Sequence, residues 1–332
     1  MKITVFGAGK SGIAVSKRLH KEHDIFLTEE KENIDSSTIE LLETLKIDFE
    51  LGGHTQKALE GANLIVLSPG VPLDIPILQK ARIWKIPIIG EAELACSFIK
   101  KPIIAVTATN GKTTTTALVG KMLKDYGFKA AVAGNIGYPL ISVNDSMLDY
   151  VVAEISSYQL ETIRKFRPKI SVILNITEDH LTRHRTMEEY ASKKAAIFKN
   201  QRGNDCLIYN ADDGIVRGIL KKALCKKIGF SRIKRIKEGA YIQNSYVCFD
   251  KTRICKTSEI RIKGEHNLEN SLAAASVAMI CGVSANSIRK TLKQFKGVEH
   301  RIEFIRRLKG ILFYNDSTVS YTHLTLPTKR IV

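Results

Sequence analysis

The amino-acid sequence predicts an α/β fold with largely parallel sheets, and three observations support this prediction. Short apolar runs of four to six residues recur between helical patterns, as in βαβ units. A glycine-rich turn, VFGAGKSG at residues 5–12, joins the first apolar run to a helical pattern. A second strand–loop–helix pattern, VTATNGKTTTT, occupies residues 106–116. A chain of 332 residues is long enough for two or three such domains.

The apolar runs place the expected elements along the chain. Strands are expected at residues 3–6, 25–28, 64–67, 86–89, 103–107, 130–133, 150–154, 171–174 and 206–209. Helices are expected at residues 11–20, from 112 onward, around 188–198, at 266–281 and at 285–295, with a β-hairpin region at 241–262.

Breaks in this pattern divide the chain into domains. A basic pair and a proline at residues 100–102 precede a fresh β-rich run, which indicates a first domain at residues 1–100 and a central domain at 101–297. Residues 298–317 resemble the opening strands of a third domain. We therefore expect a Rossmann-like first domain, a central domain around the second loop, and only the start of a third.

Composition and charge narrow the function classes. The N-terminus lacks the pattern of a secretion signal, and the most apolar helical stretch is too short to span a bilayer, so we expect a cytoplasmic protein without membrane insertion. Six scattered cysteines without a CxxC pair are typical of reduced thiols. A net charge of +17, densest at residues 221–237, is compatible with nucleic-acid binding. No groove-reading motif accompanies it, so a solvated surface or anionic small substrates explain the charge better.

The glycine-rich turn predicts a first phosphate-binding site. Gly7, Gly9 and Gly12 form a G-x-G-x-x-G pattern before a helix, and Glu29 follows at the end of the next strand. Such glycines let the backbone approach a diphosphate at a helix N-terminus. The segment LSPGVP at residues 67–72 could close over the same crevice. NAD, a nucleotide-diphosphate sugar, or plain helix–strand packing would each explain this pattern.

The second loop predicts a triphosphate site with a metal ion. Backbone N–H groups and Lys112 would hold the β- and γ-phosphates, and the Thr113 hydroxyl would reach Mg²⁺. The usual pattern has another glycine five residues before Gly111, and here that position is Val106. Glu154 ends an expected strand beside the loop, where a carboxylate can ligate a hard cation. His180 would be a hydrogen-bonded structural residue if it stood alone.

Taken together, these segments resemble the Mur ligase family, whose loop T-G-T-N-G-K-[ST] is shorter than the usual pattern. The similarity covers about residues 1–317. It rests on the loop, on Glu154, and on the segments TEDH at 177–180, Y-x-x-x-K at 190–194, HNLEN at 266–270 and EHR at 299–301. EISSYQLE at 154–161, LSPGVP and the N-terminal G-x-G-x-S-G are similar to the branch of the family that adds D-glutamate.

The resemblance implies a set of site residues. The ATP-binding residues would be Thr109, Asn110, Gly111, Lys112, Thr113, Thr114, Asn267, Asn270, Arg301 and Asp316. The metal ligands would be Thr113, Glu154, His180 and Lys194, the last as a carbamate formed with CO₂; Lys112, Glu154, His180 and Lys194 would be the catalytic residues. The UDP-linked substrate would contact Gly9, Ser11, Gly12, Glu29, Ser68, Pro69, Gly70, Asn135, Ser156 and Gln159.

The resemblance also implies the reaction. The expected enzyme is a monomeric ATP-dependent amide ligase with two Mg²⁺ ions, which joins D-glutamate to UDP-N-acetylmuramoyl-L-alanine through an acyl phosphate in peptidoglycan synthesis. An NAD-binding oxidoreductase is the alternative; it leaves Lys112, Glu154 and His180 unexplained.

Three features depart from the family. Ala108 replaces a glycine of the loop, and Thr182 stands where the family commonly has aspartate. From Thr318 onward the sequence shows no resemblance, so residues 318–332 are interpreted as a foreign tail. Because the family's third domain closes over ATP, we expect impaired activity in a chain that lacks it.

Overall fold

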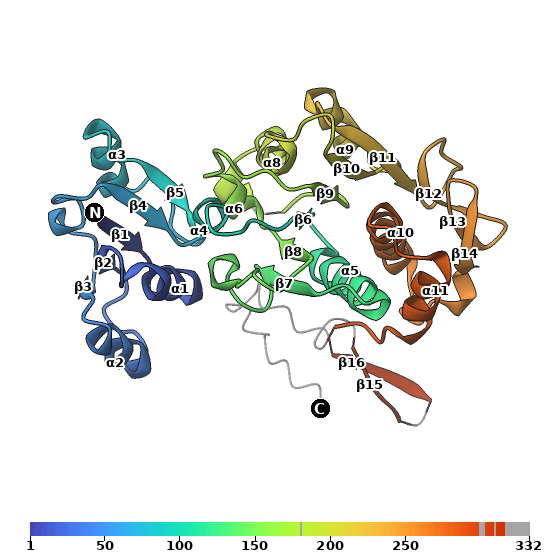
Figure 1. Ribbon diagram of the computed structural model, residues 1–332, viewed down its shortest axis with the longest axis horizontal. Helices are drawn as coiled ribbons and strands as arrows, with labels where there is room; N and C mark the ends of the chain where they lie inside the picture. The colour runs from blue at the N-terminus through green and yellow to red at the C-terminus, as the bar shows by residue number, and fades with distance from the viewer. Residues whose placement is uncertain (180, 299–302, 309, 316–332) are drawn as a thin grey trace, which may run out of the picture.

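The N-terminal unit is a five-stranded parallel sheet flanked by helices (Figure 1). The computed structural model of the protein describes residues 1–179, 181–298, 303–308 and 310–315. The strands lie in the order β3-β2-β1-β4-β5. Their bounds are β1 (Lys2–Phe6), β2 (Asp24–Thr28), β3 (Asp48–Glu50), β4 (Leu64–Leu67) and β5 (Ile88–Gly90). The helices are α1 (Lys10–Leu19), α2 (Ser36–Thr44), η1 (Gln56–Ala58), α3 (Pro76–Ile83) and α4 (Glu91–Ala95).

The central unit is a nine-stranded sheet in the order β14-β13-β12-β11-β10-β9-β6-β8-β7. Neighbours from β12 to β7 are parallel, and β13 pairs antiparallel with β12 and β14. The first strands are β6 (Ile103–Thr107), β7 (Ala130–Gly134), β8 (Tyr150–Glu154), β9 (Ile170–Ile173) and β10 (Cys206–Asn210). The others are β11 (Lys226–Ser231), β12 (Gly239–Gln243), β13 (Tyr246–Phe249) and β14 (Thr252–Lys256).

Helices cover both faces of this sheet. Along β6, Ile104 and Val106 join one core cluster while Ile103 and Ala105 join the other, as the alternation of a strand requires. α5 (Lys112–Tyr126), α10 (Glu265–Ile280) and α11 (Ala285–Gln294) lie on the face of Ile104. The remaining elements of the unit are η2 (Leu140–Ser142), α6 (Ser157–Leu160), α7 (Leu181–His184), α8 (Met187–Ala195), η3 (Ala196–Phe198), α9 (Gly214–Ile219), η4 (Leu220–Lys222) and η5 (Thr257–Glu259). The buried strands explain why the sequence shows continuous apolar runs.

A separate antiparallel pair, β15 (Glu303–Leu308) and β16 (Ile311–Asn315), follows the central unit. It corresponds to the segment that the sequence indicated as opening strands. Residues 318–332 lie outside the described part of the chain.

The α/β prediction with parallel sheets is confirmed, with local corrections. β5 begins two residues later than expected, because residues 86 and 87 have no regular secondary structure and Pro87 has no N–H to donate to a neighbouring strand. β3 and β11 were not predicted, and the expected hairpin region forms three strands. β11 lies inside the basic run at residues 221–237: its first two residues are exposed lysines and its last four are buried. The charges therefore mark the exposed start of a core strand.

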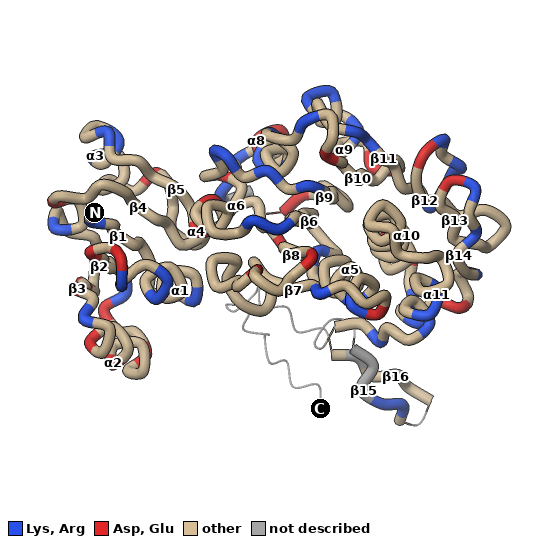
Figure 2. The backbone as a smooth tube through the Cα atoms, in the orientation of Figure 1, with Lys and Arg blue, Asp and Glu red and all other residues tan. Residues whose placement is uncertain are grey.

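Charge is spread over both units. Figure 2 shows Lys and Arg segments along the whole trace, interspersed with Asp and Glu. Within the described residues, no helix combines the length and apolar character needed to cross a bilayer.

Candidate nucleotide and substrate site

The loop between β6 and α5 has the backbone geometry of a phosphate cradle. Gly111 has a φ of 86°, in the left-handed region that favours glycine, and α5 begins at the next residue. The helix N-terminus presents N–H groups to an anion. The Nζ of Lys112 donates to the carbonyl oxygens of Ala108 and Thr109 at 2.9 and 2.8 Å. An ammonium group in this position lies beside any phosphate that the loop holds.

Alanine fits at position 108. Ala108 is fully buried and is absent from the residues with positive φ, so its backbone conformation does not require glycine. Its carbonyl oxygen accepts hydrogen bonds from both Lys112 Nζ and Lys194 Nζ, the latter at 2.8 Å. The departure from the family's glycine therefore leaves the loop geometry intact.

The segment after β9 holds the loop from the side. Asn175 Oδ1 accepts from the N–H of Asn110 at 2.8 Å, and Asn175 Nδ2 donates back to the Asn110 carbonyl oxygen at 3.0 Å. The Thr109 hydroxyl lies 3.2 Å from the carbonyl oxygen of Thr177. The sequence analysis missed Asn175, although an asparagine directly after a strand beside the loop was the available signal.

A carboxylate, a hydroxyl and an amide converge beside the loop. Glu154 ends β8 and is 1% exposed; its Oε2 accepts from Thr113 Oγ1 at 2.9 Å, and its Oε1 accepts from Asn135 Nδ2 at 2.8 Å. Oxygen ligands of this kind suit Mg²⁺, which is held by one or two carboxylates plus phosphate oxygens. Among the described residues, no group of three or more His, Cys, Asp or Glu side chains is arranged so that it could hold a metal ion by itself. The residues present therefore fit a cation that is shared with a bound polyphosphate.

Lys194 approaches the loop from α8. Its side chain is 1% exposed, and its Nζ lies 4.5 Å from the centroid of the Tyr190 ring. Burial first, and then the nearby Lys112 ammonium, hold the pKa of this amine well below its usual range, against an opposing effect of Asp179. Burial also raises the pKa of Tyr190 to about 12. The Lys194 amine thus loses its proton more readily than an exposed lysine does.

The start of α10 closes the far side of the loop. Asn270 is buried and donates to Asn267 Oδ1 at 3.2 Å. A Cβ atom at Gly111 would overlap the side-chain oxygen of Asn270. The structure thus brings one of the two predicted asparagines against the phosphate loop.

Replacing Gly111 by alanine is expected to weaken nucleotide binding. The left-handed conformation costs a non-glycine residue about 1–2 kcal/mol, and the added Cβ also displaces Asn270. Gly127→Ala is the matched control, since Gly127 caps the other end of α5 with a φ of 108° and an open Cβ position. The temperature of thermal unfolding should drop for both variants. Titration with Mg²⁺ and ATP should show weaker nucleotide affinity for Gly111→Ala alone. Equal affinities would contradict the cradle role.

A first cavity lies at the carboxyl ends of β1, β2 and β4. It measures about 400 Å³, and its lining includes Gly9, Ser11, Glu29, Ser68, Pro69 and Gly70, as well as Lys10, Glu30, Lys31 and His54, which the sequence analysis did not single out. Ligands bind at this edge of open parallel sheets. Six of the predicted substrate residues therefore share one cavity.

The three glycines of the turn have different roles. A Cβ at Gly7 would lie 2.9 Å from the Ser68 side chain, and one at Gly12 would overlap the carbonyl oxygen of Gly7. Gly9 has no atom within 4 Å of its Cβ position and faces the cavity. Glu29 accepts a hydrogen bond from the Ala8 N–H at 2.6 Å. Gly12 thus serves packing, while Gly9 leaves space for a ligand.

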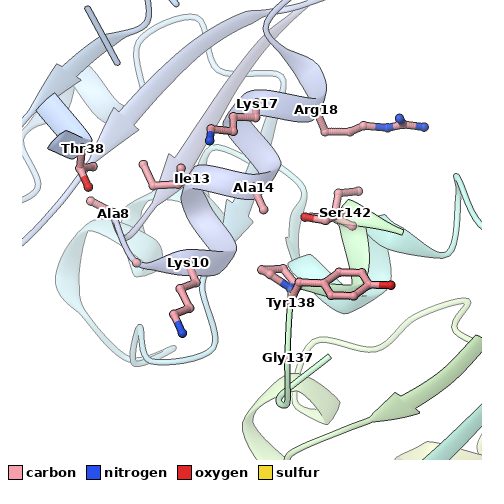
Figure 3. Close-up of a pocket in the computed structure, with 13 residues that line it drawn as sticks. Ala8, Lys10, Ile13, Ala14, Lys17, Arg18, Thr38, Gly137, Tyr138 and Ser142 are labelled. Atoms are coloured by element: carbon pink, nitrogen blue, oxygen red, sulfur yellow. The ribbon is translucent and has the colours of Figure 1, made fainter. Parts of the chain in front are cut away.

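A second cavity of about 580 Å³ adjoins the first, because both are lined by Gly9 and Lys10. Figure 3 shows Lys10 and Lys17 from α1 on one side and Tyr138 and Ser142 from the segment after β7 on the other. This cavity connects the end of the glycine-rich turn to the central unit.

Ser156 and Gln159 form a capping box at the start of α6. The Gln159 N–H donates to Ser156 Oγ at 3.3 Å, and Gln159 Oε1 accepts from the Ser156 N–H at 2.9 Å. Burial raises the pKa of the nearby Glu91 carboxyl, and the side chain of buried Gln159 opposes this shift. The structure thus gives both predicted substrate residues a structural bond.

The remaining predicted positions are placed unevenly. Thr114 lies in the first turn of α5 beside Thr113. His180, Arg301 and Asp316 lie outside the described residues, as does the side chain of Thr182.

The central unit has a phosphate-binding loop between a parallel strand and a helix, and a carboxylate at the end of a neighbouring strand bonds the threonine of that loop. The preceding unit has a Rossmann-like cavity. Together these features define a nucleotide-dependent enzyme of two α/β domains. Two family models specify the class. The Mur ligase middle domain matches residues 106–278, and the N-terminal domain of MurD-like Mur ligases matches residues 1–90. The chain belongs to the Mur ligase family.

Curated relatives agree with this assignment. The chain is 49% identical over 324 residues to the UDP-N-acetylmuramoylalanine–D-glutamate ligase of Thermoanaerobacter sp. (strain X514), covering 95% of this chain and 71% of that protein. The enzyme of the same name from Caldanaerobacter subterraneus subsp. tengcongensis is 46% identical over 320 residues, with the same coverage. No such relationship supports the oxidoreductase alternative.

Solved structures share the fold. A UDP-N-acetylmuramate:L-alanyl-γ-D-glutamyl-meso-diaminopimelate ligase from Neisseria meningitides superposes with a TM-score of 0.64 at 18% identity, over 90% of this chain and 99% of that one. The UDP-N-acetylmuramate–alanine ligase of Thermotoga maritima gives a TM-score of 0.57 at 22% identity, over 96% and 74%. The prediction of the Mur ligase fold is confirmed.

Proposed function

We propose that this chain is an ATP-dependent ligase that joins D-glutamate to UDP-N-acetylmuramoyl-L-alanine in peptidoglycan synthesis. The observation that carries this proposal is the junction of the Lys112 loop with the Glu154–Thr113–Asn135 cluster, in a chain 46–49% identical to ligases of that name. Residues 1–100 would bind the UDP-linked substrate, residues 101–297 would bind ATP, and residues 298–317 would begin a third domain. Residues 318–332 would form a tail foreign to the family. The protein would act as a cytoplasmic monomer.

In the proposed reaction, an oxygen of the alanyl carboxylate attacks the γ-phosphorus of ATP, the bond to ADP breaks, and an acyl phosphate forms. The D-glutamate amine then attacks the acyl carbon, phosphate leaves from the tetrahedral intermediate, and the amine loses a proton. Lys112 and the loop N–H groups would hold the β- and γ-phosphates against the repulsion between two anions. Thr114, Asn267, Asn270, Arg301 and Asp316 would complete the nucleotide site.

Thr113 and Glu154 would hold one Mg²⁺, and His180 and Lys194 would help to hold a second. Bound Mg²⁺ would neutralise the charge that builds up on the transferred phosphoryl group. Asn135 orients Glu154 by its 2.8 Å hydrogen bond. Gly9, Ser11, Glu29 and the loop at residues 68–70 would hold the uridine diphosphate, with Gly12 shaping the turn. Asn135, Ser156 and Gln159 would face the sugar and its phosphate.

The proposed reaction is tested by supplying ATP, Mg²⁺, UDP-N-acetylmuramoyl-L-alanine and D-glutamate and measuring ADP and the amide product by mass spectrometry. Product formation should require all four components. ADP release that ignores the UDP compound would contradict the proposal.

Lys194 would act as a carbamate. A neutral amine attacks CO₂, the new N–C bond forms and a proton is released, which converts the buried amine into an anionic oxygen ligand for a metal ion. We expect Lys194→Ala to lose most of the ligase activity and to regain part of it with acetate, because a small carboxylate can enter the space that the buried side chain leaves. Lys193→Ala, at the neighbouring surface position, should keep its activity and show no acetate effect. Failure of acetate at every concentration would count against the carbamate.

A further inference from the structure

The N-terminal and central units are tied together near the linker that joins them. The Glu93 carboxylate accepts three backbone N–H bonds from residues 164–166, at 3.0, 2.6 and 2.9 Å. Asp145 Oδ2 accepts the N–H groups of Lys100 and Lys101 at 2.6 and 2.9 Å. Both contacts lie at or beside residues 91–102, so they fix the linker between the two units. The position of the mouth of the first cavity relative to the central unit depends on other contacts.

Arg183 makes such a contact at the mouth. Its Nη2 donates to the carbonyl oxygen of Val71 at 3.1 Å. Val71 belongs to the substrate loop, residues 68–72, which lines the first cavity. Figure 1 shows α6 on the side of the central unit that faces β5, and α6 packs against α4 there. The guanidinium group therefore spans the two units where the predicted UDP site opens.

The central unit holds the Arg183 side chain rigidly. Nε and Nη2 donate to the two oxygens of Glu161 at 3.2 and 2.7 Å, and the guanidinium carbon lies 5.0 Å from the centroid of the Tyr158 ring. The side chains of Arg183 and Glu161 are 18% and 5% exposed. His184 Nδ1 lies 3.6 Å from Glu161, and its Nε2 lies 3.0 Å from Ser157 Oγ. A planar fork with five donors can satisfy the carboxylate and the carbonyl oxygen together, which an ammonium group cannot do in the same geometry.

The partners of Arg183 connect to the nucleotide site along the chain. Glu161 directly follows α6, which begins three residues after Glu154 at the end of β8. His184, which contacts Glu161, also packs on the Tyr190 ring at 5.1 Å between centroids, and Tyr190 hydrogen-bonds Thr109 of the phosphate loop at 3.3 Å. A shift of the substrate loop would therefore displace a set of packed side chains that extends to the phosphate loop.

We propose that Arg183 is a positioning residue that fixes the substrate loop relative to the nucleotide site, so that occupation of one site strengthens binding at the other. This inference rests on the proposed function, because it takes a UDP-linked carboxylate as the ligand of the first cavity. The distance between the carboxylate of the UDP compound and the γ-phosphate of ATP would then depend on the Arg183 guanidinium, although neither ligand needs to contact it. Coupling of this kind is reciprocal between the two ligands.

The test is a pair of calorimetric titrations with the full chain. UDP-N-acetylmuramoyl-L-alanine is titrated with and without a saturating non-hydrolysable ATP analogue and Mg²⁺. In the unsubstituted chain, the nucleotide should tighten the binding of the UDP compound by about fivefold or more. In Arg183→Ala, the affinity without nucleotide should stay within about twofold, and the nucleotide effect should fall below about twofold. Ethylguanidine should restore part of that effect.

Matched variants separate positioning from general damage. Arg202→Ala removes an exposed arginine side chain, while the backbone N–H of residue 202 still donates to Asp205. This variant should keep the full nucleotide effect. If Arg183→Ala does not fold, as judged by its thermal transition, Arg183→Lys decides: lysine cannot serve both partners, so a reduced effect is expected. An unchanged nucleotide effect in the Arg183 variants, or none in the unsubstituted chain that binds both ligands, would overturn this inference alone. Failure of the unsubstituted chain to bind the UDP compound would overturn the proposed function and the inference with it.

Discussion

Lys112→Ala is expected to weaken the binding of Mg²⁺ and ATP by roughly a hundredfold. Lys112 Nζ lies over the loop carbonyl groups of residues 108 and 109, where the phosphates of a bound nucleotide would lie. One charge-assisted hydrogen bond contributes about 1.5–3 kcal/mol, and about 1.4 kcal/mol corresponds to a factor of ten. Calorimetric titration of a non-hydrolysable ATP analogue measures the change.

Lys121→Ala is the matched control for this variant. Lys121 lies on the same helix, is partly exposed and pairs with Asp125 at 2.9 Å, so its removal should leave nucleotide affinity unchanged. The affinity of Lys112→Ala for the UDP compound should also be unchanged, since the first cavity contains no residue of α5. A nucleotide affinity within twofold of the unsubstituted chain would remove Lys112 from the phosphate site.

Glu154→Gln should abolish the part of nucleotide affinity that depends on Mg²⁺. Glutamine has the same shape, so it can keep a hydrogen bond to Asn135 or Thr113, but it carries no charge with which to hold a cation. We expect the ratio of affinities with and without Mg²⁺ to fall by about tenfold or more, a change of at least ~1.4 kcal/mol. Parallel titrations in Mg²⁺ and in EDTA give this ratio.

Glu188→Gln controls for the loss of one negative charge. Glu188 is exposed in the first turn of α8, so its substitution should leave the ratio unchanged. If Glu154→Gln binds the nucleotide with the same Mg²⁺ dependence as the unsubstituted chain, the carboxylate at the end of β8 is not a metal ligand.

Much of the fold could be predicted because buried parallel strands are continuous apolar runs. β6 and β8 have the residues that the sequence indicates, and the helices after both glycine-containing turns begin within one residue of the expected position. β3 could not be recognised, because its three residues, Asp48–Glu50, are only partly buried and include two acids. β11 was hidden for a different reason: its exposed lysines dominate the local composition, while the strand character lies in the four residues that follow.

The candidate site was predictable where a residue type has a chemical reason for its place. Thr113 and Glu154 meet in space, and Lys112 folds back over the loop, as the strand–loop–helix pattern implies. Asn175 and Arg183 were not found, because their roles depend on contacts across 65 and 112 residues of sequence. Ser156 and Gln159 differ from Asn175 and Arg183, because their spacing in the sequence is enough to indicate the capping box that they form. Local patterns therefore identify the loop, while the contacts that hold it require the folded chain.

The most direct test of the whole account is to measure the binding of UDP-N-acetylmuramoyl-L-alanine to this chain by titration calorimetry, with NAD as the control ligand. The account predicts saturable binding of the UDP compound at one site and no binding of NAD, since a UDP-linked substrate is assigned to the cavity of Gly9, Ser11 and Ser68. Binding of NAD without the UDP compound, or binding of neither, would contradict the assignment of that cavity.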